Sequence, residues 1–392
     1  MSAVRVLSHD LLSDEERLVL KAARSVAGSF GRKYWLEKWS LGEEPRELWK
    51  RMKDEGLAGT GVPEDLGGSG MGLMGAVLVQ EGFALEGLPM IQFLVTHFVR
   101  DIILKAGTRE QKERFVTPTC VDGKRLSFAL TEPQAGSNTW RISTFARREE
   151  RGYVLRGQKV FISGAGESDF MMVVARTKRY EEVRDKRDGI SIFVVETDSP
   201  NLRLQRLNID TKSPEWQYMV YFDDVEVPPE NLIGRENEGY RALFHGLNVE
   251  RLMIAAIAVG LGTYALARAA EHARQRVVFD VPIGSHQGVQ FPLARALIKL
   301  EAARSLIYSA ARLYDNDAGS VELANAAKFM ASEAAVEALD AAVQTFGGYA
   351  WDFETDVLNL YPIVRLFKTA PVTNELILSY IATHVLRLPK SY

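Results

Sequence analysis

The feature that most constrains this chain is a change of hydrophobic periodicity, from helical to strand-like and back. Apolar residues in the first third follow a helical spacing, as at 74–85 and 93–106. The middle third contains short runs rich in β-branched and aromatic residues, punctuated by Gly, Pro, Asp and Asn, which is typical of antiparallel strands. Helical spacing then returns and persists. We therefore predict a helical, a β and a second helical domain, covering residues 1–125, 126–238 and 239–392.

Long helices with short connections are predicted for the last third, which is the pattern of an antiparallel bundle. In the first third, Ser13 followed by Glu16 forms a capping box that begins the first helix. The predicted fold class is therefore α+β multidomain, with a helical N-terminal domain, an antiparallel β barrel or sandwich, and a C-terminal four-helix bundle. The four predicted bundle helices cover residues 240–276, 287–314, 322–346 and 374–388.

Composition excludes several classes of protein. The 48 Lys and Arg residues are balanced by 51 Asp and Glu, so no basic excess favours nucleic acid. No apolar run is expected to approach the length of a membrane span, and the six histidines show no metal-ligand spacing. Cys120 is the only cysteine, and the acidic start lacks the apolar segment of a secretory signal. We expect a cytoplasmic protein.

The glycines at 70, 72 and 75 match the GxGxxG spacing of a dinucleotide-binding turn. The segment before them is PEDLGGS, whereas such a turn requires a preceding strand and a following helix. We predict a loop followed by the start of a helix.

The most specific motif is LTEPQAGS at residues 130–137. Pro133 and Gly136 predict a turn directly after an apolar strand, with small residues and hydroxyls where the backbone could approach a ligand. This eight-residue segment resembles the LTEPxAGS motif of the acyl-CoA dehydrogenase family of flavoproteins. The resemblance extends along the chain in order, through GVPEDLGGSG (61–70), GQKVFISGAGESD (157–169) and FDDVEVPPENLIGRENEGY (222–240).

The resemblance implies FAD as the cofactor and assigns its binding residues. For each position alone the alternative is a structural role, with Phe161 and Phe279 in the core and Arg276 as a surface charge, and the joint match in register favours FAD. Positions matching the flavin-ring surroundings are Phe128, Leu130, Thr131, Phe161 and Ser163, while Ser137 matches a serine near the pyrophosphate and the substrate. Arg276 and Phe279 match a pair that grips the nucleotide end of FAD across a dimer interface, and Gln287 follows at the expected spacing. Gln344, Gly347 and Gly348 match a glycine turn against the pyrophosphate.

The implied reaction also needs a base that removes the substrate α-proton. Such a base is a carboxylate in a dry pocket with a raised pKa. In most of the family it lies on a loop whose matching position here is Pro371, which cannot accept a proton and lacks the N–H that would polarise the thioester. Thr373 and Glu375 match other positions of that loop, assigned to cofactor binding. Glu250-Arg251 resembles the arrangement in isovaleryl-CoA and long-chain acyl-CoA dehydrogenases, which carry the base on a helix beside an Arg.

We therefore predict Glu250 as the catalytic base and Arg251 as a substrate-binding residue. The alternative for Glu250 is a surface residue or an ion-pair partner. The resemblance implies α,β-dehydrogenation of an acyl-CoA to the 2-enoyl-CoA, with electrons passed to an electron-transfer flavoprotein, in a homotetramer. Two alternatives stay open on the same fold: a flavin oxidase or monooxygenase that uses oxygen, and a non-catalytic subunit that binds FAD or CoA within a hetero-oligomer.

Overall fold

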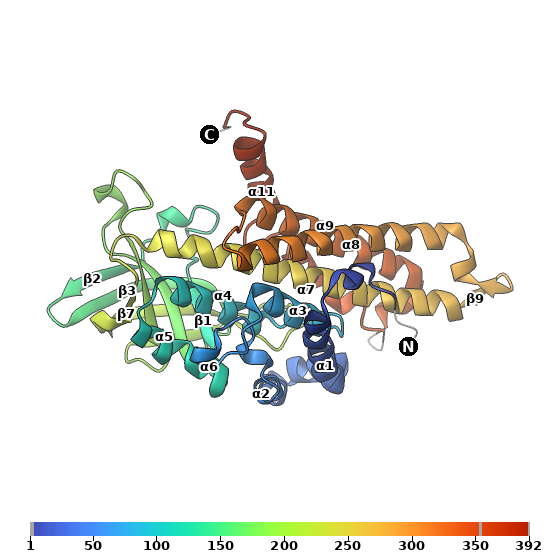
Figure 1. Ribbon diagram of the computed structural model, residues 1–392, viewed down its shortest axis with the longest axis horizontal. Helices are drawn as coiled ribbons and strands as arrows, with labels where there is room; N and C mark the ends of the chain where they lie inside the picture. Colours follow the sequence, from blue (N-terminus) through green and yellow to red (C-terminus); the bar gives the residue numbers. More distant parts are fainter. Residues whose placement is uncertain (1–3, 353–354, 391–392) are drawn as a thin grey trace.

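The structure is a computed structural model that describes residues 4–352 and 355–390. A β domain occupies one end of an elongated molecule and long helices run to the other end (Figure 1). The N-terminal helices pack along one side of the long helices. The predicted order of helical, β and helical parts is confirmed.

Within residues 4–125 the N-terminal domain contains six α-helices. The first begins at the predicted capping box, where the Ser13 hydroxyl accepts from the Glu16 N–H at 3.2 Å and the Glu16 carboxylate accepts from the Ser13 N–H at 2.8 Å. It kinks at Gly31, whose φ is +72°. The helices are α1 (Asp14–Leu41), α2 (Arg46–Asp54), α3 (Gly72–Ala84), α4 (Ile91–Ala106), α5 (Arg109–Phe115) and α6 (Thr117–Val121).

The glycine-rich segment before α3 is a loop followed by a helix, as predicted. The N-terminus of α3 receives a side chain from the C-terminal end of α8 (Gln287–Asp315). The Asp315 carboxylate accepts from the main-chain N–H groups of Leu73 and Met74 at 2.6 and 2.9 Å. A negative charge at this position satisfies N–H groups that have no partner within the helix. The loop therefore serves helix packing in this chain.

The β domain is one eight-stranded sheet with the order β6-β7-β3-β2-β4-β5-β8, and β1 pairs with β4 at its side. Most pairs are antiparallel, as predicted, but β4 pairs in parallel with both β1 and β2. The strands are β1 (Leu126–Ala129), β2 (Phe145–Glu149), β3 (Gly152–Ser163), β4 (Phe170–Arg176), β5 (Ile190–Glu196), β6 (Leu202–Arg206), β7 (Gln217–Val227) and β8 (Leu232–Ile233).

Three long helices dominate the C-terminal domain: α7 (Gly239–Gln275), α8 (Gln287–Asp315) and α9 (Val321–Phe346). By length and composition α7 could cross a membrane, so the expectation that no apolar run approaches that length is wrong. However, 83% of its most apolar window is buried within the protein. The other helices surround α7, which explains why it is apolar on nearly all sides.

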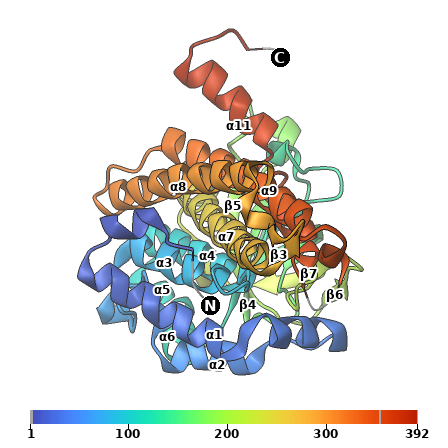
Figure 2. The ribbon, with the colours of Figure 1, turned by 90° about the vertical axis from the view of Figure 1, so that its right-hand side faces the viewer.

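A two-residue hairpin of β9 (Val277–Val278) and β10 (Val281–Pro282) joins α7 to α8 at the end of the molecule away from the sheet (Figure 1). After α9 the chain forms α10 (Tyr361–Leu366) and α11 (Asn374–Tyr380), and a π-helical turn covers Ile381–Val385. Both ribbon views show α11 projecting from the body of the molecule (Figures 1 and 2). The last helix is thus shorter than the predicted 374–388.

Candidate active site

The candidate base Glu250 lies in the first half of α7, where the helix packs on α4. One turn earlier, Gly246 touches α4 so closely that a Cβ there would lie 2.4 Å from Ile102. The Glu250 carboxylate is partly buried and makes no hydrogen bond or ion pair within the described parts of the chain. Burial raises the pKa of Glu250 to about 7, against the opposing charges of Arg251 and Lys328. An unengaged carboxylate with this pKa is suited to accept a proton near neutral pH.

Arg251 does not form an ion pair with Glu250. Its Nη1 donates to the Leu247 carbonyl at 3.1 Å and to the Asn248 side-chain oxygen at 2.7 Å. Its buried Nε–H has no partner among the described residues. Burial lowers the pKa of Arg251, whereas the Glu250 charge raises it. The guanidinium thus stands beside the carboxylate without neutralising it by direct contact.

Lys328 on α9 connects Glu250 to the loop that carries Pro371. Its buried ammonium donates to the Val372 carbonyl at 2.7 Å and to the Asn374 side-chain oxygen at 2.8 Å. The same charge acts on Glu250. The loop position and the helical position, two alternative sources of the base, therefore share one buried cation. Sequence reasoning missed Lys328, because a lysine within an Ala-rich helix gives no signal of burial.

The remaining loop residues have local roles. The Thr373 hydroxyl caps α11 by accepting from the Leu376 N–H at 3.3 Å. Glu375 is exposed at the start of the same helix, and hydrogen bonding, first to its own backbone N–H and then to Thr373, lowers its pKa. An exposed, readily ionised carboxylate is a poor candidate for a tuned base. The pKa of Glu250 is raised and that of Glu375 is lowered, so Glu250 is the better candidate for the base, as the sequence predicts.

The residues predicted around the flavin ring lie where β1 and β3 meet. The Val160 N–H donates to the Thr131 carbonyl at 2.9 Å, and the Lys159 ammonium donates to the Leu130 carbonyl at 2.8 Å. Phe128 lies on β1, and its ring packs edge-on against Phe98 of α4 at 5.0 Å between centroids. Because Gly246 also lies against the Phe98 carbonyl, these strands adjoin the part of α7 that carries Glu250.

Phe161 has a conformation that packing does not explain. It lies within an irregularity of β3, where the pairing register with β7 shifts between Lys159 and Ile162, and its φ is +60°. Its ring is 60% exposed. Bulges of this kind often redirect side chains beside active sites, and positive φ is unfavourable for a large side chain. Ser163, at the end of the strand, accepts from the Gln217 side-chain amide at 2.8 Å.

The predicted turn after β1 is confirmed, since Glu132 and Ala135 exchange backbone hydrogen bonds of 3.0 and 3.2 Å. Ser137 is exposed beyond this turn. The Glu132 carboxylate is buried and forms an ion pair of 3.0 Å with Lys159, whose side chain is also fully buried. It also accepts from the Thr144 N–H at 2.9 Å. The Glu132–Lys159 ion pair thus holds the LTEPQAGS segment against β3. Neither residue was singled out from the sequence.

The residues predicted for the nucleotide end gather at the opposite end of the bundle. Two adjoining cavities of about 500 and 430 Å³ lie there. Arg276 ends α7, and its guanidinium lies 5.7 Å from the Tyr349 ring centroid. Gln287, at the start of α8, is exposed. Lining residues of the two cavities include Arg276, Phe279, Gln344, Gly347, Gly348 and Tyr349.

Phe279 and the glycine turn provide room for a ligand. Phe279 has a φ of +54° at the tip of the β9-β10 hairpin and is 88% exposed. Such a turn favours Asn or Gly, so a phenylalanine there is not explained by local geometry. A Cβ added to Gly347 or Gly348 would meet nothing within 4 Å. An open glycine turn beside an arginine fits an anionic pyrophosphate.

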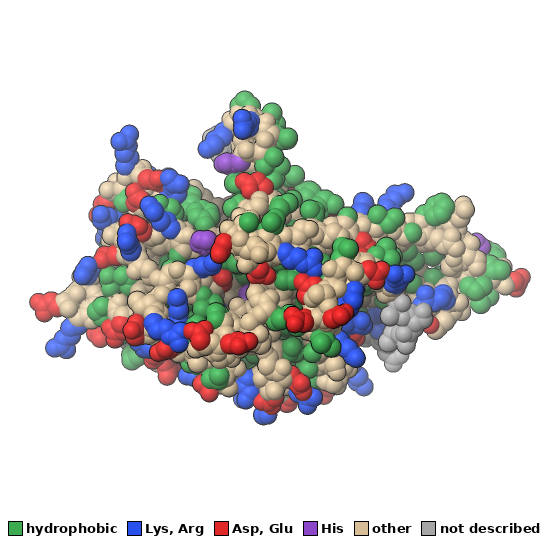
Figure 3. Space-filling model, viewed as in Figure 1, with side chains coloured by type: hydrophobic (Ala, Val, Ile, Leu, Met, Phe, Trp, Pro, Cys, Tyr) green, Lys and Arg blue, Asp and Glu red, His purple; other side chains and the backbone are tan. Residues whose placement is uncertain are grey.

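Within one chain the two predicted groups are far apart. The sheet carrying Phe128 and Phe161 lies at one end of the molecule, and the hairpin carrying Phe279 lies at the other (Figure 1). The space-filling view shows hydrophobic side chains exposed at the hairpin end (Figure 3). One chain therefore cannot place both groups around the same ligand.

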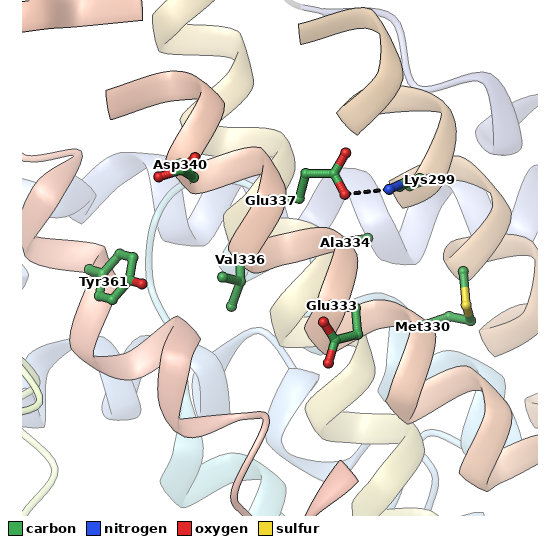
Figure 4. Close-up of a pocket in the computed structure, with 8 residues that line it drawn as sticks. All are labelled: Lys299, Met330, Glu333, Ala334, Val336, Glu337, Asp340 and Tyr361. Carbon is green, nitrogen blue, oxygen red and sulfur yellow. Dashed lines mark hydrogen bonds and ion pairs between the residues drawn. The ribbon is translucent and has the colours of Figure 1, made fainter. Parts of the chain in front are cut away.

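A separate cavity of about 420 Å³ lies between α8, α9 and α10 and contains none of the predicted site residues. Figure 4 shows Glu337 reaching across the gap to form an ion pair with Lys299, with Tyr361 on the other side. Glu333, also in its lining, accepts from the Asn374 side-chain amide at 2.8 Å. This cavity thus adjoins the polar contacts that hold the loop, and not the candidate base.

The arrangement defines a class of protein: a three-domain helical, β and helical fold with a carboxylate close to the residues predicted to surround a flavin ring. Models of the acyl-CoA dehydrogenase N-terminal, middle and C-terminal domains match residues 13–122, 127–225 and 237–386. The chain belongs to the acyl-CoA dehydrogenase family. It is a flavoprotein oxidoreductase whose cofactor is FAD, and FAD complexes occur among solved structures of similar fold.

Individual relatives agree with this assignment. The chain is 39% identical to acyl-CoA dehydrogenase FadE12 of Mycobacterium tuberculosis, covering 97% of this chain and 98% of the relative. It is 33% identical to the caffeyl-CoA reductase-Etf complex subunit CarC of Acetobacterium woodii, covering 93% and 96%. The structure of butyryl-CoA dehydrogenase from Megasphaera elsdenii superposes with a TM-score of 0.91 at 30% identity, covering 96% and 99%.

Proposed function

We propose that the chain oxidises an acyl-CoA thioester to the 2-enoyl-CoA, with Glu250 as the base, and passes the electrons to an electron-transfer flavoprotein. The observation that carries this proposal is the Glu250 carboxylate, which is unpaired within the described residues and has a pKa raised to about 7 on an apolar helix. Removal of an α-proton requires such a group. When bound, FAD supplies the acceptor for the hydride that leaves the β-carbon.

The surrounding residues orient the reactants. Leu130, Thr131 and Phe161 are the residues that would hold the flavin ring, and Phe98, which contacts both Phe128 and Gly246, connects them to α7. Arg251 holds a positive charge next to Glu250, which favours the ionised form of that carboxylate. The apolar surroundings of Glu250 exclude water, which protects the carboxylate from solvation and the enolate-like species from reprotonation.

The same fold supports both directions of electron flow among relatives, since the CarC subunit is named as a reductase in an Etf complex. That relationship supports an electron-transfer flavoprotein as the partner of this chain.

A homotetramer, built as a dimer of dimers, is supported by the exposed apolar side chains of α11 and the segment beyond it: Leu378, Val385, Leu386 and Leu388. The buried, unpaired Cys120 supports a cytoplasmic location.

The test is anaerobic bleaching of the purified flavoprotein by a panel of acyl-CoA thioesters, followed by reoxidation. We expect bleaching by at least one saturated thioester and rapid reoxidation by an electron-transfer flavoprotein. Stoichiometric hydrogen peroxide from oxygen would instead identify an oxidase. No bleaching by any thioester, with full flavin content, would refute the catalytic proposal.

A further inference from the structure

The face of α7 that carries Glu250 is accessible over only a short stretch. Leu247 and Glu250 are partly exposed. One turn further along the helix, Ile254 is 6% exposed, and after it Ile257 is fully buried. The spacing i, i+3, i+7, i+10 places these four residues on one side of the helix. The accessible surface of this face therefore ends about one helical turn beyond the candidate base.

The helix α4 supplies the wall opposite this face. Gly246 lies so close to α4 that a Cβ there would be 2.4 Å from the Ile102 side chain and 3.0 Å from the Phe98 carbonyl. The spacing i, i+4, i+7, i+11 of a single helix face joins Ile91, Val95, Phe98 and Ile102. The face of α4 that packs on α7 therefore also carries Ile91, which is partly exposed, and Val95, which is 5% exposed.

The space between the two helices closes in the direction away from Gly246. Further along α7, a Cβ on Gly260 would lie 2.4 Å from Ala84, the last residue of α3. Since Gly246 meets the second half of α4 and Gly260 meets the chain before α4 begins, the start of α4 lies beside the part of α7 between these glycines. Ile257 in this part is fully buried. The accessible surface thus ends before the contact with α3.

We infer that the acyl chain occupies a short apolar site bounded by Ile91, Val95 and Ile254, so that the preferred substrates are acyl-CoA thioesters with short chains of about four to six carbons. This inference rests on the proposed function, which places the substrate α-carbon at Glu250. The three bounding side chains are apolar and suited to an unsubstituted alkyl group.

The chain length follows from the length of the accessible face. One helical turn, the separation of Glu250 and Ile254, is about 5.4 Å. An extended alkyl chain advances about 1.3 Å for each C–C bond, so about four bonds fit beyond the α-carbon. A longer chain would have to displace the buried side chain of Ile257. Closely packed interiors resist such insertion, because it forces side chains and backbone out of their favoured positions.

The experiment measures anaerobic flavin reduction by butyryl-, hexanoyl-, octanoyl- and dodecanoyl-CoA with the FAD-loaded protein. We expect kcat/KM for the better of the two short thioesters to exceed that for dodecanoyl-CoA by about 100-fold. The affinities for the corresponding 2-enoyl-CoA products, measured by titration calorimetry, should fall in the same order. Calorimetry reports chain length without depending on turnover.

Two variants change the boundary of the site in opposite directions. Ile257→Ala removes the side chain that closes it and should raise kcat/KM for octanoyl-CoA relative to hexanoyl-CoA by about 10-fold. Ile254→Phe narrows the site and should lower kcat/KM for hexanoyl-CoA more than for butyryl-CoA. Ile307→Ala is the matched control, because Ile307 on α8 is equally buried. Its replacement should lower Tm and leave the order of the four thioesters unchanged.

The outcomes separate this inference from the proposed function. Equal or better use of dodecanoyl-CoA by the wild type overturns the inference and leaves the proposed function standing. A chain-length profile that neither Ile257→Ala nor Ile254→Phe alters also overturns it. Absence of flavin reduction by every thioester overturns the proposed function. The calorimetric order then decides the chain length, and tighter binding of the dodecenoyl than of the hexenoyl thioester overturns the inference as well.

Discussion

The ionisation of Glu250 should control the rate of flavin reduction near neutral pH. Burial raises the pKa of this carboxyl to about 7, while Arg251 and Lys328 oppose the shift. Only the ionised form can accept the α-proton. The rate of reduction at saturating thioester should therefore fall as the pH drops below about 7 and become constant above it.

The size of the effect follows from the pKa. With a pKa of about 7, roughly 3% of Glu250 is ionised at about pH 5.5. With the ordinary glutamate pKa of 4.5, roughly 90% would be ionised at the same pH. The two cases therefore differ by about 30-fold in rate at about pH 5.5, and both give full ionisation well above neutrality.

Anaerobic stopped-flow measurement of flavin bleaching across this range is the direct assay. Glu250→Gln keeps the shape of the side chain and removes proton acceptance, so reduction should slow by about 10²–10⁴-fold. The variant should still bind FAD and still alter the flavin spectrum on addition of a thioester. A rate profile that stays flat down to about pH 5, or near wild-type bleaching by the variant, would refute this assignment. Glu375 would then be the next candidate.

The same pKa shift predicts a change of stability with pH. A carboxyl whose pKa is raised on folding favours the folded state when protonated, below the unfolded pKa of 4.5. That contribution is lost as the pH rises through the folded pKa of about 7. Glu250→Gln should therefore melt at a higher temperature than the wild type above pH 7, and the difference should shrink towards pH 4.5. Calorimetry of both proteins across this range checks the sign.

Three further predictions concern neighbouring elements. Lys328→Met should lower stability by about 1–3 kcal/mol, because two buried acceptors lose a charged donor, and should move the midpoint of the rate profile to higher pH. Lys299→Met, at a partly exposed ion pair, should change neither. Arg276→Ala should lower flavin occupancy while the fold survives, and full occupancy would contradict its assignment. Pro371→Glu should partly restore bleaching to Glu250→Gln, and no gain at any pH would place residue 371 away from the substrate.

Elements defined by local signals were predicted well from the sequence. The capping box at Ser13 begins α1, and the segment after Gly70 is a loop and a helix start instead of a nucleotide-binding turn. The long helices were found because their periodicity is sustained over many turns. The last helix was overestimated because α11 gives way to a π-helical turn that the apolar pattern at 374–388 does not reveal.

Contacts between distant segments were not predictable in the same way. Lys328 and Gln80 are polar residues within helical sequences, and a polar residue in such a sequence normally indicates an exposed face. Their burial depends on which helices surround them, and one sequence does not specify this. The parallel pairing of β4 with β1 is likewise a property of chain topology, and the residue pattern of the strands does not determine it.

Two exposed phenylalanines, Phe161 and Phe279, bear on whether subunits of this protein associate. Phe161 and Phe279 both adopt positive φ, both project into solvent, and they lie at opposite ends of one chain (Figure 1). One FAD could contact both kinds of residue only if the sheet end of one subunit lay against the hairpin end of another. In the proposed dimer, a second subunit related by a two-fold axis would meet this condition and would create an identical second site. In such a dimer the sheet end and the hairpin end of each subunit would both be covered by the partner. The assembly would therefore stop at two subunits and would not extend into a filament. In the proposed dimer, a shared cofactor site would account for the positive φ and the exposure of both phenylalanines together.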